Sequence, residues 1–211
     1  IINSFDYYFS SVEYLEYFNF RLVDFSTPRF HIVKDFESQP VLFPSFAEPI
    51  ITTKQYLNFA KLHSDSIVLD LGAYSGLTSI IFRELSKKVI AVDADKSNLF
   101  CIKKNFKVYE KISNKKIELL EGAIWKDNLG LYFSTEGNMG SSAVDLLGEN
   151  RGNLEFVNSY KLIDIVKKYN LDKVDFIKCD IEGAELVIFE DDDFFNFTKP
   201  RIIIEPHFID N

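Results

Sequence analysis

The chain has 211 residues, a mass of 24.4 kDa and a formal net charge of −8 at pH 7. Hydrophobic residues make up 46% and charged residues 27%, which is typical of a globular protein that buries a core without disulfides or metals. The excess of acidic residues argues against nucleic acid as a partner, because that affinity depends on clustered Lys and Arg. No apolar run approaches the roughly 18 residues of a membrane span, and the amino-terminal pattern is not that of a signal peptide. A cytoplasmic protein without a membrane span is therefore predicted.

Residues 1–50 are rich in aromatic side chains and end in a stretch punctuated by proline. They predict an amino-terminal accessory segment that precedes one domain over 51–211. Two interpretations of the aromatic residues stay open. They pack against their own domain or a second copy of the chain, which would make a homo-oligomer, or they stack on a sugar or line a lid. The general burial of apolar side chains favours packing.

From about residue 52 the apolar residues alternate between helical and strand-like spacing. In chain order they predict helices over 53–62, 77–85, 99–106, 162–169 and 184–189. The strands predicted between and after these helices cover 67–71, 88–92, 117–120, 131–133 (a short one), 174–179 and 201–205. This alternation predicts an α/β fold, a mostly parallel, doubly wound sheet with helices on both faces. Ligands of such sheets bind outside the carboxyl ends of the strands.

The first strand runs into the sequence DLGAYSG over 70–76. Its glycines allow a turn where the backbone approaches a ligand closely. The turn differs from the dinucleotide fingerprint, because the place of the second glycine holds Tyr74. Asp70 would repel a pyrophosphate but suits a ligand that carries a sulfonium and an ammonium. An NAD-dependent oxidoreductase is therefore the less favoured alternative.

The second strand ends at Asp93, at about the 20-residue spacing where an acid accepts hydrogen bonds from ribose hydroxyls. Together, Asp70 and Asp93 favour an adenosyl cofactor with a positive end. A glycine turn also serves merely to pack a helix on a strand. A non-catalytic Rossmann-like binding module therefore remains the second alternative.

The strand over 174–179 leads into the sequence DIEGAE over 180–185, where three acids follow an apolar run. Asp180 stands at the expected ligand edge of the sheet, which favours a functional role. Helix capping is the alternative for Glu182 and Glu185, because the macrodipole favours acids in a first helical turn.

These motifs resemble the FkbM family of methyltransferases, with a D-x-G-A-x-x-G motif at 70–76 and a D-x-x-K-x-D-x-E-G-A-E hallmark at 175–185. The resemblance includes 92–94, 122–125 and 203–207 and covers about residues 48–208. It implies a Rossmann-like class I methyltransferase fold that uses S-adenosylmethionine for O-methylation. Pro206 departs from the family pattern, and the closing helix and hairpin are lacking, so we expect the carboxyl-terminal end of the domain to be incomplete.

The resemblance implies that Gly72, Ala73 and Gly76 form the cofactor loop, that Asp93 binds the ribose and that Ala123 lies beside the adenine. Asp70 and Asp180 would face the methionine end. Thr78 is expected to bond the cofactor carboxylate, with a local helix cap as the alternative. Ser142, in a Gly- and Ser-rich stretch where a substrate loop belongs, is expected to reach the cofactor or acceptor, with a surface excursion as the alternative. The full set expected to bind the cofactor is Asp70, Gly72, Ala73, Tyr74, Gly76, Thr78, Asp93, Ala94, Gly122, Ala123, Ser142 and Asp180.

A hydroxyl acceptor needs a base that removes its proton as the new bond forms. The candidates are Glu182, His207 and Asp180, and among the three histidines His207 alone closes a strand at the ligand edge. A metal held by these three residues is the less favoured alternative, and no metal is expected. The expected acceptor is a hydroxyl of a sugar, a glycoconjugate or a secondary metabolite, and the aromatic segment favours a carbohydrate.

Overall fold

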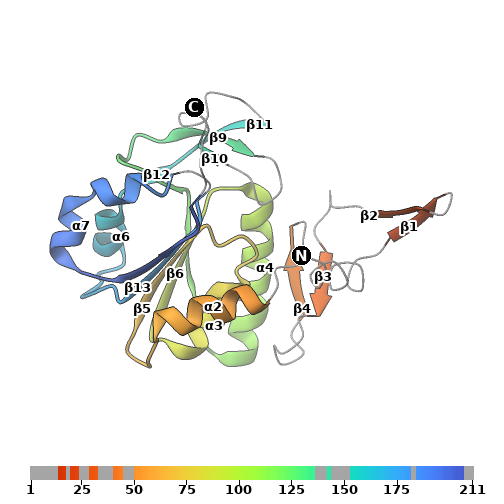
Figure 1. Cartoon of the computed structure of the whole chain (residues 1–211), viewed down its shortest axis with the longest axis horizontal. Coiled ribbons are helices and arrows are strands. Elements are labelled where there is room, and N and C mark those ends of the chain that lie inside the picture. Colours follow the sequence, from red (N-terminus) through yellow and green to blue (C-terminus); the bar gives the residue numbers. More distant parts are fainter. Residues whose placement is uncertain are drawn as a thin grey trace.

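A computed structural model of the chain describes residues 14–17, 20–23, 29–32, 40–44, 50–135, 142–143, 153–181 and 184–206. Its centre is a five-stranded parallel sheet in the order β14-β13-β5-β6-β7 (Figure 1). The strands are β5 (Ile67–Leu71), β6 (Lys88–Asp93), β7 (Glu118–Glu121), β13 (Phe176–Cys179) and β14 (Arg201–Ile204). The chain builds β5, β6 and β7 outward in one direction and then returns to add β13 on the other side of β5. The strand order therefore reverses between β5 and β13, which is where ligands of such sheets bind.

Helices cover both faces of this sheet (Figure 1). The helices α2 (Ile50–Ala60), α3 (Leu77–Leu85) and α4 (Lys96–Ser113) lie on one face, and α6 (Leu162–Lys168) and α7 (Asp192–Phe197) lie on the other. Alternate residues of each strand supply two separate cores, because side chains of a strand point to opposite faces in turn. Leu69 packs in the core on the α6 side, and Val68 packs in the core on the α3 side. The predicted Rossmann-like, doubly wound α/β fold is confirmed.

A small antiparallel sheet, which the apolar pattern does not predict beyond its first strand, follows β7. It consists of β10 (Ser142–Ala143), β9 (Leu131–Thr135) and β11 (Asn153–Val157), in that order. Between it and the main sheet, β8 (Ala123–Ile124) pairs in parallel with β12 (Ser159–Tyr160). The inner side chains of β9 pack against Ala94, which directly follows β6. The small sheet is thereby anchored at the carboxyl ends of the main strands.

Two antiparallel strand pairs lie in the amino-terminal part, β1 (Tyr14–Tyr17) with β2 (Phe20–Val23) and β3 (Arg29–Ile32) with β4 (Pro40–Phe43). Strand β4 contacts α4 of the main domain. The division of the chain at residue 50 and the homo-oligomer stay predictions. Among the described residues, none of the helices combines the length and the apolarity that crossing a bilayer requires.

The predicted helix over 184–189 is wrong. The structure has a short 3-10 helix, η1 (Val187–Glu190), followed by α7. The physical reason is the buried carboxylate of Asp191, which accepts a hydrogen bond from the backbone N–H of Phe194 and so starts a new helix. The acids that follow an apolar stretch here end one helical turn and begin another.

Candidate active site

Four residues stand at the carboxyl ends of the central strands and form what we call the strand-end row: Asp180, Gly72, Asp93 and Glu121. Cys179, Leu71, Val92 and Leu120 stand side by side in the row before it. The N–H of Asp180 donates to the carbonyl oxygen of Leu71 at 3.1 Å, and the N–H of Gly72 donates to that of Val92 at 3.0 Å. Three residues of the predicted cofactor site thus lie together where the strand order reverses.

The glycine loop, residues 72–76, connects β5 to α3. Gly72 has a φ of 73°, and a Cβ there would lie 1.7 Å from the carbonyl oxygen of Asp180. Gly76 has a φ of 79° and packs against the ring of Phe106. Tyr74 also adopts the left-handed conformation, with a φ of 53°, which costs a non-glycine residue about 1 kcal/mol. A tyrosine therefore takes a conformation here that glycine would adopt without cost.

A buried lysine stands between two acids of the predicted site. Lys178 is the direct neighbour of Asp70 across β13 and β5. Its Nζ donates to the carbonyl oxygen of Gly72 at 2.6 Å and lies 3.3 Å from Oδ2 of Asp180 and 3.7 Å from Oδ1 of Asp70. Two carboxylates against one ammonium leave a net negative charge when both are ionised. Such a group suits a cationic ligand.

Asp70 is fully buried, and burial raises the pKa of its carboxyl, opposed first by Lys178 and then by the Ser79 hydroxyl, which donates to Oδ2. Its Oδ1 accepts no hydrogen bond. Asp180 keeps 23% of its side chain exposed. Of these two acids, Asp180 is the one that is accessible from solvent.

Asp93 ties the glycine loop to the start of α4. Its carboxylate accepts from the N–H of Tyr74 at 2.8 Å and from the N–H of Asp95 at 2.9 Å. The side-chain amide of Asn98 donates to both oxygens, at 3.2 and 3.3 Å. Burial raises the pKa of Asp93 to about 7, although these hydrogen bonds oppose the shift. Asp93 therefore gains or loses a proton near neutral pH.

An apolar cluster begins at Ala94, the residue directly after Asp93. Ala94 packs in a cluster with Trp125, Leu131 and Phe133, and Ala123 lies against the same cluster. Gly122 donates its N–H to the carbonyl oxygen of Asp93 at 2.8 Å. Ala123, which is expected beside the adenine, thus packs against the same cluster as Ala94, the residue that follows the acid expected at the ribose.

Four predicted site residues remain, Thr78, Ser142, Glu182 and His207. The hydroxyl oxygen of Thr78 lies 3.1 Å from that of Thr53 in α2, and both side chains are buried. Ser142 lies in β10 and pairs with Ser134 of β9. Glu182 and His207 fall outside the described residues. Their role as base and the metal alternative therefore stay untested.

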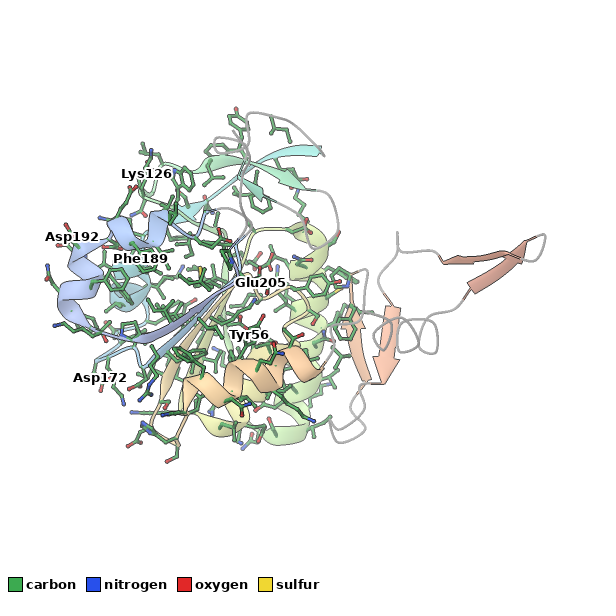
Figure 2. All side chains as sticks on the ribbon, viewed as in Figure 1. Tyr56, Lys126, Asp172, Phe189, Asp192 and Glu205 are labelled. Atoms are coloured by element: carbon green, nitrogen blue, oxygen red, sulfur yellow. The ribbon has the colours of Figure 1, made fainter. Side chains whose placement is uncertain are left out.

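Two residues at this site, Lys178 and Glu205, were not assigned a role from the sequence. Lys178 is a lysine within an otherwise apolar strand, and that contrast was the available signal. Glu205 directly follows β14, is exposed, and accepts a hydrogen bond from the hydroxyl of Tyr56 at 3.1 Å (Figure 2). Its N–H donates to the carbonyl oxygen of Cys179 at 3.0 Å. Glu205 thus extends the line of acids at the carboxyl edge.

Comparison with known proteins identifies the family. The sequence profile of the methyltransferase FkbM domain matches residues 70–211. No match was found among the curated proteins. Similar solved structures include precorrin 8W decarboxylase from Methanobacterium thermoautotrophicum, with 12% identity, a TM-score of 0.46 and coverage of 75% of this chain and 63% of that one.

Two further structures are similar at this level. Precorrin-6y C5,15-methyltransferase from Geobacter metallireducens has 18% identity, a TM-score of 0.42 and coverage of 75% of this chain and 62% of that one. Methyltransferase FkbM from Methylobacillus flagellatus has 18% identity, a TM-score of 0.42 and coverage of 65% and 35%. The chain spans less than two thirds of the length of each of these three proteins. Because the family profile covers more than half of its residues, the chain belongs to the FkbM methyltransferase family.

Proposed function

We propose that this protein is an S-adenosylmethionine-dependent O-methyltransferase that acts on a hydroxyl of a sugar, a glycoconjugate or a secondary metabolite. The observation that carries the proposal is the charge arrangement at the carboxyl ends of β5 and β13, where Asp70 and Asp180 share Lys178. A net negative charge at this place favours a cofactor with a positive end over a pyrophosphate. Membership of the FkbM family supports the same assignment.

The residues present fit the cofactor. Asp180 would face its sulfonium and ammonium groups, with the charge of buried Asp70 behind it across Lys178. Asp93 would face its ribose, and Ala94 and Ala123 its adenine. Asp93 is already held by two backbone N–H groups, so its carboxylate is oriented before a ligand arrives. When bound, S-adenosylmethionine supplies the methyl group that the acceptor oxygen attacks.

The chain's own part in the reaction is to align the acceptor and to remove its proton. Among the described carboxylates of β5 and of the residues directly after β13 and β14, Asp180 and Glu205 are accessible, whereas Asp70 is not. We assign the base role to Asp180, with Glu205, Glu182 and His207 as further candidates. Lys178 orients Asp180 through their 3.3 Å contact.

Exposed aromatic side chains on the small sheet support a carbohydrate acceptor. Tyr132 and Phe156 lie on the outer face of the small sheet, with exposed fractions of 53% and 61%, and their ring centroids are 5.5 Å apart. The inner face of the same sheet packs against Ala94 beside Asp93. Aromatic side chains combine an apolar face with a defined geometry, which suits the binding of a ring-shaped acceptor.

Calorimetric titration with S-adenosylmethionine, S-adenosylhomocysteine and NAD tests the cofactor. We expect the first two to bind, NAD to remain silent, and Asp93→Ala to weaken binding about tenfold or more, which corresponds to about 1.4 kcal/mol. Glu121→Ala is the matched control, because Glu121 stands next to Asp93 but pairs on the surface with Lys103. A folded wild-type protein that binds neither adenosyl compound would overturn the proposal and favour a non-catalytic module.

Transfer of a labelled methyl group to a panel of acceptors tests the substrate class. The panel contains sugar nucleotides, a surface glycan and a macrolide. Activity on the sugars is expected. Full activity on the macrolide with none on any sugar would remove the preference for carbohydrate.

A further inference from the structure

The amino-terminal strand β4 lies outside the residues 70–211 that the family profile matches, yet it contacts the glycine loop. We propose that β4 is a positioning element for the cofactor, and that Asn105 and Phe43 are the positioning residues through which it holds the loop. This inference rests on the proposed cofactor. The connection runs by two routes, one polar and one apolar.

The polar route passes through Asn105, a buried residue of α4. Its side-chain oxygen accepts from the N–H of Leu42 at 2.9 Å, and its side-chain nitrogen donates to the carbonyl oxygen of Leu42 at 2.8 Å. The same nitrogen donates to the carbonyl oxygen of Ser75 in the glycine loop, also at 2.8 Å. One amide thus fixes β4 and the glycine loop at once. An aspartate lacks the two donors and a leucine lacks every one of these groups.

The apolar route passes through Phe43. Phe43 and Val41 are fully buried and form a cluster with Tyr74 and Leu77. The ring centroids of Phe43 and Tyr74 are 6.3 Å apart. This packing helps to offset the cost of the left-handed conformation of Tyr74, whose N–H donates to Asp93. Loss of Phe43 would therefore change the packing of Tyr74, and through Tyr74 the position of Asp93, the acid proposed to bind the ribose.

A merely structural role predicts a different pattern from a positioning role. Phe43→Leu and Asn105→Leu each remove one route. Phe82→Leu is the matched control. Phe82 is also fully buried, but it packs edge-on against Phe176 in the core on the α3 side of the sheet, at a centroid distance of 5.5 Å. Substitutions of this kind cost cores comparable amounts of stability.

The experiment measures two quantities for the three full-length variants and wild type, at a temperature where all are folded. The first is amide hydrogen exchange over residues 74–77 without ligand, which reports local opening of the loop. The second is the Kd for S-adenosylhomocysteine. We expect faster exchange and about a tenfold higher Kd in Phe43→Leu and Asn105→Leu, because a loop that is competent about a tenth of the time weakens binding in proportion. Phe82→Leu should change neither.

The cofactor KM should rise in the two variants while kcat is kept. Equal changes in Phe82→Leu, or loop exchange that stays at the wild-type rate in both test variants, would overturn the positioning role. The exchange measurement needs no cofactor. It therefore tests the loop even if wild type fails to bind an adenosyl compound, an outcome that would overturn the proposed function instead.

Discussion

Replacing Lys178 by methionine removes the ammonium that lies between Asp70 and Asp180 while it keeps most of the buried stem. Asp70 is fully buried, so the substitution leaves a carboxylate without its nearest opposite charge. Breaking a buried pair in this way costs about 3–5 kcal/mol. The carbonyl of Gly72 also loses the donor that lies 2.6 Å away. We expect the free energy of unfolding to fall by about 3–5 kcal/mol at pH 8, a large part of a typical domain's stability.

The loss should depend on pH. Burial already raises the pKa of Asp70 and Lys178 is the largest opposing influence, so the variant raises that pKa further. A group whose pKa is higher in the folded state than in the unfolded state favours folding at low pH, and this contribution disappears as the pH rises through the folded-state value. Protonated Asp70 needs no ammonium partner. The difference in stability between variant and wild type should therefore be larger at pH 8 than at pH 5.

Urea unfolding at pH 5 and pH 8 measures both effects, with circular dichroism and the fluorescence of the buried Trp125 as probes. Lys103→Met is the control, because the Lys103–Glu121 pair is 2.8 Å long but half exposed. It should cost less than about 1 kcal/mol at either pH. A loss for Lys178→Met no greater than that of the control, or a loss equal at both pH values, would refute the reasoning.

Three further predictions concern two residues of the strand-end row, Gly72 and Asp93, and the threonine pair between α2 and α3. Gly72→Ala should lower the free energy of unfolding by more than about 2 kcal/mol in a denaturant titration, because the new Cβ meets the carbonyl oxygen of Asp180 and φ is positive; a loss within about 0.5 kcal/mol would contradict this. With a pKa of about 7 for Asp93, ribose hydroxyls favour the ionised form, so calorimetry should find constant affinity for S-adenosylhomocysteine above pH 7 and about a tenfold loss per pH unit below it; a flat profile would contradict the ribose role. Thr53→Val and Thr78→Val should each cost about 1 kcal/mol of stability through their shared hydrogen bond, but Thr78→Val alone should weaken cofactor binding; equal affinities would remove Thr78 from the site.

The main sheet was predictable because its strands are short, continuous apolar runs. The strand predicted over 67–71 is β5 as observed. Since parallel strands end at one edge, Asp70, Asp93 and Asp180 were expected to lie together, and the strand register places them in adjoining strands. Local pattern and topology rules were sufficient for this part.

The contacts of Lys178 and Asn105 were not predictable in the same way. Lys178 lies opposite Asp70 only because β13 pairs with β5 in one particular register. Asn105 joins residues 63 positions before it and 30 positions before it. Neither relation leaves a periodic pattern in the sequence, because each depends on how distant elements pack.

The alternation of side chains along the central strands explains why the polar groups of the site share one face. Val68 packs on the α3 side, so Asp70, two residues later, points there too; Phe176 and Lys178 repeat this relation in the neighbouring strand. The α6 side of these strands receives the other set of residues, which is apolar. Lys178 can therefore contact both Asp70 and Asp180, because the three side chains lie on the same side of the sheet. A lysine one residue earlier or later in β13 would be buried in the opposite, apolar core. The position that the fold tolerates for this charge is therefore also the position from which it contacts both acids.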